Sequence, residues 1–239
     1  MNDIDNRAIE YLSKNYLQNI PAIMSLRKQS GKVVFNDESG VIIYERQNGL
    51  YFVSSDGNGI ISEFIRNTVL KNSTIISLRE RNTEYLFENT DVLKKVVCHQ
   101  VVYTGKPLKT DDVKGLEIKV LDTTYTDLVN DNYSLKLDRE YIAKRISSSD
   151  IYGAFLDGAF AGFIGRHDEG SMGMLEVLPD YRRKGIGTAL QHYILKVVLK
   201  AGEIPYAHIK EHNEPSLAMQ RNLGEMVQAP EKIAFLIYD

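Results

Sequence analysis

The sequence predicts a mixed α/β protein built from two successive copies of one fold. Short stretches rich in Val, Ile, Tyr and Phe alternate, in both halves, with stretches whose apolar residues recur at helical spacing. The halves also share an order of strand, glycine turn, helix, strand, asparagine and helix. A polar segment, Gly105 to Gly115, lies between them and is expected to be a linker. We expect two domains, residues 1–110 and 116–239, each with a mixed, mostly antiparallel sheet flanked by helices.

Turn residues separate the elements of the first half. Asn48-Gly49 is a hairpin signal, and Ile60, Phe64 and Val69 recur at helical spacing. The elements expected here are a helix over 6–26, strands over 32–36, 40–46 and 50–55, a helix over 57–71, a strand over 73–78, a helix over 82–90 and a strand over 94–104.

The second half has similar punctuation. Asp157-Gly158 predicts a tight hairpin, and Gly202 is a natural C-terminal cap for the helix before it. The elements expected are a strand over 116–121, helices over 124–130 and 138–147, a hairpin over 151–165, a strand over 171–178, a helix from 186 to about 202, a strand over 204–212, a helix over 214–224 and a strand over 232–239.

The internal repeat is weak residue by residue but consistent in order. Gly57 and Gly59 correspond to Gly185 and Gly187, each pair lying between a strand and a helix. Downstream, "ISLRERNTEYL" aligns with "AHIKEHNEPSL", so that two asparagines coincide. The first copy lacks the basic residues of the second. The alternative is that two unrelated halves resemble each other by chance.

Composition excludes several classes of protein. The 239 residues are 43% hydrophobic and 26% charged, with a net charge of -3, so no general positive field favours nucleic acid or anionic membranes. No apolar run approaches the ~18 residues of a membrane helix, and the acidic start does not resemble a signal peptide. The single Cys98 lies in an apolar strand and is expected to be structural. We expect a soluble cytoplasmic protein with neither a nucleic-acid nor a membrane partner.

A charged glycine corner joins a strand to a helix at Arg182, Arg183, Lys184, Gly185 and Gly187. Free N–H groups at a helix N-terminus and the positive end of its dipole favour phosphate, and glycine lets the backbone approach the anion closely. The corner is therefore expected to bind a pyrophosphate. Neither a P-loop pattern nor the dinucleotide fingerprint is present. The alternative is a basic surface turn that only caps a helix.

The pattern around this corner resembles the GNAT superfamily of acyl-CoA-dependent N-acyltransferases. The matching residues are Val177, Pro179, Arg182, Gly185, Gly187, Asn213 and Ser216. The resemblance extends over residues 117–239, and the first half is a degenerate copy. Within the superfamily, "LPDYRRKGIG" and "IPYAHIKEHNEPSL" are most similar to the glycine N-acyltransferase-like branch.

The resemblance implies that acetyl-CoA, or another acyl-CoA, is the acyl donor. Backbone amides of the corner would hold the pyrophosphate, and pantetheine would pair with the strand before it. The residues that it assigns to the donor are Leu175, Val177, Arg182, Arg183, Lys184, Gly185, Ile186, Gly187, Thr188, Asn213 and Ser216. No metal is expected, because His208 and His212, four apart on a strand, would lie ~13 Å from each other.

Two side chains are candidates for the catalytic base. His208 lies five residues before Asn213, and its ordinary pKa of about 6.5 suits a proton acceptor at neutral pH; the alternative is a histidine packed in the sheet. Glu176 interrupts an apolar strand, where a carboxylate is costly unless it is paired or faces a cleft. It would act as a base through water or neutralise a nearby cation.

Three positions depart from the family pattern. Ser171 stands where the glycine N-acyltransferase branch has a glutamate. Gln220 stands where the family has a tyrosine that acts as general acid, and Glu225 where it has phenylalanine. A CoA thiolate is a good leaving group, so loss of the tyrosine need not abolish catalysis. The expected function is transfer of an acetyl group to a primary amine of a small molecule such as an amino acid. The alternative is an inactive acyl-CoA-binding regulatory or interaction protein.

Overall fold

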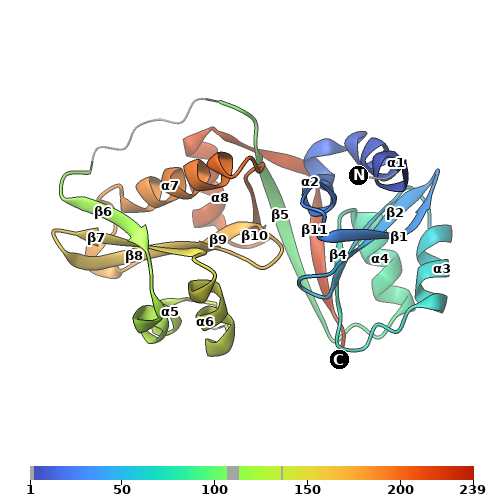
Figure 1. Cartoon of the computed structure of the whole chain (residues 1–239), viewed down its shortest axis with the longest axis horizontal. Coiled ribbons are helices and arrows are strands. Elements are labelled where there is room, and N and C mark those ends of the chain that lie inside the picture. The colour runs from blue at the N-terminus through green and yellow to red at the C-terminus, as the bar shows by residue number, and fades with distance from the viewer. Residues whose placement is uncertain (1–2, 107–112, 136) are drawn as a thin grey trace. The chain divides into compact units, whose positions relative to one another are not determined.

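The computed structural model describes residues 3–106, 113–135 and 137–239 (Figure 1). Its contacts divide the chain into two compact units. Unit 1 comprises Met1–Val102, His208–Arg221 and Met226–Asp239, and unit 2 comprises Tyr103–Ala207 and Asn222–Glu225. Most of the expected linker, at 107–112, lies outside the described residues. The expected division at 1–110 and 116–239 differs from these units mainly because His208–Arg221 and Met226–Asp239 group with the first half.

The first half of the chain contributes four helices and five strands to the described structure. They are α1 (Asp3–Ser13), α2 (Tyr16–Arg27), β1 (Gly31–Asp37), β2 (Gly40–Glu45), β3 (Leu50–Ser55), α3 (Gly59–Asn67), β4 (Thr74–Ser77), α4 (Glu80–Asn89) and β5 (Lys94–Tyr103). The expected single helix over 6–26 is wrong at its centre. Lys14 and Asn15 donate to carbonyls only three residues earlier, and this tight turn separates α1 from α2.

The second half repeats this order after an added first strand. Its elements are β6 (Leu116–Val120), α5 (Thr126–Asn132), α6 (Arg139–Ser147), β7 (Ile151–Leu156), β8 (Ala159–Arg166), β9 (Met172–Val177), α7 (Ile186–Lys200), β10 (Tyr206–Lys210), α8 (Glu214–Leu223) and β11 (Met226–Ile237). Two 3-10 turns, Thr123–Tyr125 and Pro179–Tyr181, precede α5 and follow β9. The strand pairing also repeats: antiparallel, antiparallel and parallel in β1 to β4, and again in β7 to β10.

The sheet of unit 1 has helices on both faces, and alternate residues of each strand serve opposite cores. Ile43 of β2 and Phe52 of β3 pack with α1 and α2. Ile42 and Val53, one residue away, pack instead with α3 and α4. This period-two alternation of buried apolar residues is what a strand covered on both sides requires.

The last strand of each half is exchanged within the sheet of unit 1. The order there is β1-β2-β3-β4-β11-β5-β10, so β11 pairs with β4 of the first half while β5 lies beside β10 of the second. The exchange explains why the contacts group the C-terminal strand with the N-terminal half. Strand pairing between segments distant in sequence leaves no local sequence signal.

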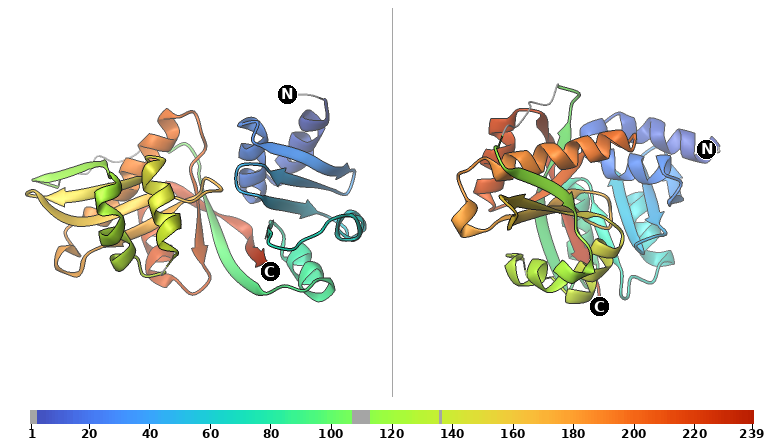
Figure 2. Two further views of the ribbon diagram at one scale, coloured as in Figure 1. Left: turned by 60° about the horizontal axis from the view of Figure 1, so that its bottom comes forward. Right: turned by 60° about the vertical axis from the view of Figure 1, so that its left-hand side comes forward.

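Unit 2 has strand order β10-β9-β8-β7-β6, where β10 contributes only Tyr206 and Ala207. Helices α5 and α6 lie on one face of these strands and α7 on the other (Figures 1 and 2). Phe163 and Met174 face the α5–α6 side and pack with Val129 and Ile142. The predicted mixed α/β fold, with a mostly antiparallel sheet flanked by helices, is confirmed.

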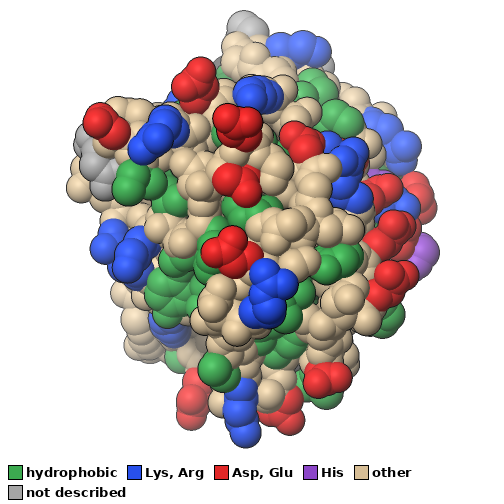
Figure 3. Space-filling view, turned by 90° about the vertical axis from the view of Figure 1, so that its right-hand side faces the viewer, with side chains coloured by type: hydrophobic (Ala, Val, Ile, Leu, Met, Phe, Trp, Pro, Cys, Tyr) green, Lys and Arg blue, Asp and Glu red, His purple; other side chains and the backbone are tan. Residues whose placement is uncertain are grey.

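The surface of unit 1 in Figure 3 carries acidic and basic side chains interspersed around small hydrophobic areas. Such mixed charge is the pattern of a solvated surface and gives no directional field toward a polyanion. Within the described residues, no helix combines the length and apolar character needed to cross a bilayer.

The stability of unit 2 is expected to depend on Arg145. Its side chain is 9% exposed and donates to Asp168 at 2.5 Å, to the Arg166 carbonyl at 2.9 Å and to Asp150. Arg145→Ala removes the buried cation from Asp150 and Asp168, although the exposed Lys144 stays 3.6 Å from Asp168, and should lower the free energy of unfolding by about 3 kcal/mol in urea titrations. Arg139→Ala, on the same helix but in an exposed pair with Asp127, is the matched control and should change stability little. Equal losses in both variants would contradict this.

Candidate functional site

The central feature of unit 2 is the separation of β9 from β10. The two parallel strands pair at a single position, Ala207 with Met172. Two residues further along β9, Met174 takes a left-handed conformation with φ of 53°, and the β8–β9 register shifts between Phe163 and Gly165. This is a β-bulge, which bends a strand and redirects its amides. After the bulge, Glu176 and Val177 pair with Phe163 and Gly162 of β8 in the shifted register, whereas in the described part of the chain no pairing with β10 continues beyond Met172.

The glycine corner follows β9 and has the backbone geometry that an anion requires. Arg183 and Gly185 are both left-handed, with φ of 64° and 80°. Gly185 is the N-cap of α7, and no side chain of the described residues caps that helix. Within the described residues, the N–H groups of Ile186, Gly187 and Thr188 therefore have no intrahelical or side-chain partner. They lie at the positive end of a 15-residue helix.

The corner and the end of β9 are held against each other. Arg182 Nε donates to the Val177 carbonyl at 2.9 Å, which folds the guanidinium back along the strand end. A Cβ on Gly187 would lie 3.6 Å from Val177, an ordinary contact. Packing alone therefore does not demand glycine at 187, and the missing Cβ leaves the backbone open to close approach by another group. Lys184 lies over the Tyr181 ring, with Nζ 5.2 Å from its centre.

Glu176 lies on the α5–α6 side of β9. Its Oε1 accepts from the Ser134 N–H at 3.1 Å, and the side chain is half-buried. Next to Ser134, Tyr133 is 4% exposed and packs edge-on against Phe163, 6.2 Å between ring centres. Burial and the carboxylates of Glu176 and Glu169 raise the pKa of Tyr133. The segment after α5 therefore meets β9 immediately beyond the bulge.

His208 is tied into the sheet of unit 1. Its Nε2 lies 3.0 Å from Oε1 of Gln100 on the adjacent strand β5, and its ring packs edge-on against Phe235. These contacts match the alternative that the sequence left open, a histidine hydrogen-bonded in the sheet. They also give the ring one fixed orientation.

The orientation of Gln100 is itself fixed by α2. Its amide Nε2 donates to the carbonyls of Leu17, at 2.5 Å, and Gln18, at 3.0 Å. Pro21 lies four residues after Leu17 and has no N–H, so the Leu17 carbonyl lacks its helical donor. Because the Gln100 nitrogen is committed to these carbonyls, its oxygen faces His208. Neutral His208 must then carry its proton on Nε2.

The remaining sequence-predicted residues begin α8 in unit 1. Asn213 Oδ1 accepts from the Ser216 N–H at 3.2 Å, a capping interaction at the start of the helix. Further along, Gln220 is 5% exposed, and its Oε1 has no hydrogen-bond partner among the described residues. In unit 2, the Gln191 amide nitrogen on α7 is likewise buried without one. Buried orphan groups of this kind commonly mark positions completed by a ligand or water.

The corresponding corner of the first half is closed. Strands β3 and β4 stay paired over four residues, from Leu50 with Thr74 to Val53 with Ser77. The side chain of Asn82 bonds both the N–H and the carbonyl of Ser55, at 2.9 and 3.0 Å. The preceding turn presents Asp56, held by Arg79 and Tyr11, in place of basic residues. A carboxylate at this position repels phosphate.

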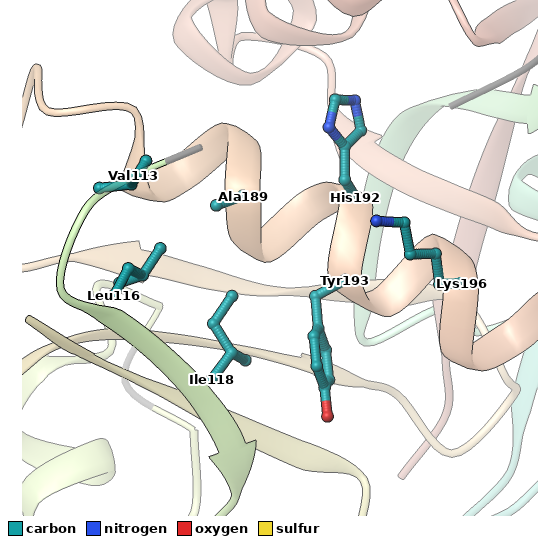
Figure 4. Close-up of a pocket in the computed structure, with 7 residues that line it drawn as sticks. All are labelled: Val113, Leu116, Ile118, Ala189, His192, Tyr193 and Lys196. Atoms are coloured by element: carbon teal, nitrogen blue, oxygen red, sulfur yellow. The ribbon is translucent and has the colours of Figure 1, made fainter. Parts of the chain in front are cut away.

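A cavity of about 230 Å³ lies on the other side of α7, against β6. Figure 4 shows Leu116 and Ile118 of β6 across from Ala189 and Tyr193 of α7. None of its lining residues belongs to β9 or the glycine corner. His192, one of them, also lies 3.6 Å from Glu225, and both are buried. Among the described residues, no three His, Cys, Asp or Glu side chains are grouped to hold a metal ion.

A family model matches part of the second half of the chain. Residues 151–231, which include β7 to α8 and therefore the glycine corner, match the family model described as FR47-like protein. No curated protein matches the chain in sequence.

Solved structures match nearly the whole chain. They include a Drosophila protein (TM-score 0.66, 16% identity, 98% of this chain and 96% of that chain), a GCN5-related N-acetyltransferase from Kribbella flavida (0.57, 12%, 92% and 95%) and an acetyltransferase of the GNAT family from Colwellia psychrerythraea (0.55, 11%, 97% and 97%). The chain therefore has a fold similar to that of GNAT acetyltransferases across both halves.

The structure brings together the sequence-predicted residues of β9 and the corner, which all lie in unit 2. His208, Asn213 and Ser216 lie in unit 1. Sequence reasoning missed Tyr133 and Gln100. Gln100 has a signal, a polar residue inside an apolar strand, whereas nothing in the sequence connects Tyr133 to a strand 40 residues later.

The proton position on His208 is directly measurable. In the wild-type protein, nitrogen-15 NMR of the imidazole ring should find neutral His208 protonated on Nε2, because Gln100 presents only an acceptor to it. Gln100→Leu removes that acceptor and should shift the ring toward a mixture of tautomers. Gln228→Leu is the control: it removes a similar contact, 3.0 Å from Nδ1 of the half-buried His99 on β5, and should leave His208 unchanged. Protonation of wild-type His208 on Nδ1 would contradict the assignment.

Proposed function

We propose that the protein is an acyl-CoA-dependent N-acyltransferase, with acetyl-CoA as donor and a primary amine of a small molecule, such as an amino acid, as acceptor. The observation that carries the proposal is the combination of an uncapped, left-handed glycine corner with a strand that leaves its parallel neighbour after one bonded pair. The GNAT-like fold and the FR47-like match support the same reaction class.

The corner fits the pyrophosphate of CoA. The amides of residues 183–188 would hold its oxygens, and Arg182, Arg183 and Lys184 supply positive charge beside them. The backbone of Leu175 and Val177, beyond the bulge, would pair with the amide groups of pantetheine as an added strand would. Asn213 and Ser216 are proposed to contact the same arm. The acyl donor supplies a thioester, whose thiolate leaves readily.

The chain has to remove a proton from the amine and stabilise charge on the acyl oxygen. Glu176 is half-buried and held in place by the Ser134 N–H, which suits a base that receives the proton directly or through water. His208 is proposed as a second proton acceptor or as a contact to the amine. The hydrogen bond to Gln100 fixes the orientation of its ring, so that in either role Nδ1 is the nitrogen that would contact the amine.

The first half is proposed to support the second rather than to bind CoA. Its own corner carries Asp56, and β3 stays paired with β4, so it offers neither positive charge nor a gap between strands. It is therefore a degenerate copy that retains the fold. This arrangement is also consistent with the glycine N-acyltransferase-like branch.

A binding protein without chemistry is the second candidate, favoured by Gln220. A glutamine cannot donate a proton as the family's tyrosine does, and its oxygen is buried. Under this alternative the donor site remains but no amine is acylated. Release of CoA thiol from acetyl-CoA in the presence of a panel of amines separates the two: release lost in Glu176→Gln supports an enzyme, and binding without release for every amine supports a regulator.

Binding of CoA is the first test. Isothermal titration should show that wild-type protein binds CoA and acetyl-CoA, and that Arg182→Ala weakens both about tenfold or more, because one charge-assisted contact to phosphate is lost. Arg139→Ala removes the same charge from an exposed helix and is the matched control, with no change expected. If the wild type binds neither ligand, the corner only caps a helix and the proposal is wrong.

A further inference from the structure

A buried tyrosine stands where the bulge of β9 meets the end of α5. Tyr133 is 4% exposed and belongs to the core cluster that contains Phe163 and Met174. Its phenol oxygen accepts a hydrogen bond from the Met174 N–H, and this contact partly offsets the rise in the pKa of Tyr133. The hydroxyl is therefore adjacent to the one left-handed residue of the strand.

The proton of this hydroxyl has no acceptor among the residues that the structure describes. A buried phenol ordinarily donates a hydrogen bond, as Tyr206 does to the carbonyl of Glu169. The phenol of Tyr141, on the same face of the sheet, is paired at 3.0 Å with Nδ1 of His167. Burial and two carboxylates raise the pKa of Tyr133, so it stays protonated at neutral pH and can act only as a donor or an acceptor, not as a base.

The position of the hydroxyl gives it a chemical use. On the proposed function, the acyl thioester lies along β9 where the strand leaves β10, and that separation begins one residue before Met174. Glu176, the proposed base, lies on the same side and is held by the residue after Tyr133. The segment 133–134 therefore touches both the bulge and the base.

We propose that the Tyr133 hydroxyl is a hydrogen-bond donor to the acyl oxygen of the bound thioester, and that Tyr133 is thus a catalytic residue. This inference rests on the proposed function. It differs from that function in naming a group from α5, which lies on the opposite face of the sheet from α7 (Figure 1).

The reaction balances without proton transfer from Tyr133. The amine nitrogen forms a bond to the acyl carbon while Glu176 receives its proton, and charge develops on the acyl oxygen. Tyr133 donates a hydrogen bond to that oxygen and keeps its own proton. The carbon–sulfur bond then breaks, and the thiolate leaves with the electron pair. Donors of this kind are worth about 10²-fold or more in kcat because they act where charge develops.

The test compares two ligands that differ at the acyl oxygen. The ketone analogue of acetyl-CoA, in which a methylene replaces the sulfur, carries a carbonyl in the acyl position but cannot transfer the acyl group, whereas CoA has no carbonyl there. In isothermal titrations Tyr133→Phe should weaken binding of the ketone analogue about fivefold, the loss of one hydrogen bond, and leave binding of CoA unchanged within about twofold. Tyr141→Phe is the matched control, since it removes a phenol oxygen from the same face and should change neither affinity. With any amine that is acylated, Tyr133→Phe should lower kcat about 10²-fold with little change in KM for acetyl-CoA.

The outcomes of these titrations separate the proposed function from the proposed role of Tyr133. Wild-type protein that binds neither ligand overturns the proposed function and the inference with it. Wild-type protein that binds both, with Tyr133→Phe affinities equal to those of wild type, overturns the inference alone. Equal weakening of CoA and of the ketone analogue in Tyr133→Phe also overturns it, because the residue would then only support the fold of the site.

Discussion

The site depends on the backbone of β9 leaving β10 after one bonded pair. Parallel strands normally continue their ladder, as β3 and β4 do over four residues. Here the pairing with β10 is limited to Met172, and the left-handed Met174 shifts the register with β8. A non-glycine residue in this region carries a backbone penalty of roughly 1–2 kcal/mol. Such strain persists where the surroundings stabilise it, and Phe163 and Tyr133 pack directly against the bulge.

The two halves share an order of elements but differ at the turn that follows β3 in the first and β9 in the second. Both have a glycine turn between a strand and a helix. In the first, Asn82 bonds the strand end and Asp56 fills the turn with negative charge. In the second, Asn213 caps its own helix and the turn is basic. In the first half, a side chain therefore bonds the backbone at the strand end. In the second half, no side chain of the described residues caps the helix that follows the turn.

Strand exchange gives the first half a direct influence on a candidate catalytic residue. Because β5 neighbours β10, Gln100 of the first half reaches His208 of the second. Pro21 contributes indirectly, since its missing N–H leaves the Leu17 carbonyl to Gln100. A helix defect in the N-terminal half thus fixes a ring in the C-terminal half through a single side chain.

The sequence by itself determined the elements and the glycine corner, because hydrophobic period, turn residues and basic charge are local properties of the chain. It predicted β9 and α7 within about two residues of their ends, and it missed the break between α1 and α2. Only the tertiary structure decided which strands exchange, that Met174 bulges, and that Tyr133 and Gln100 reach their partners. These features arise from contacts between residues about 40 to 160 positions apart. The energy of such contacts depends on how the distant segments pack together and not on the composition of either segment alone.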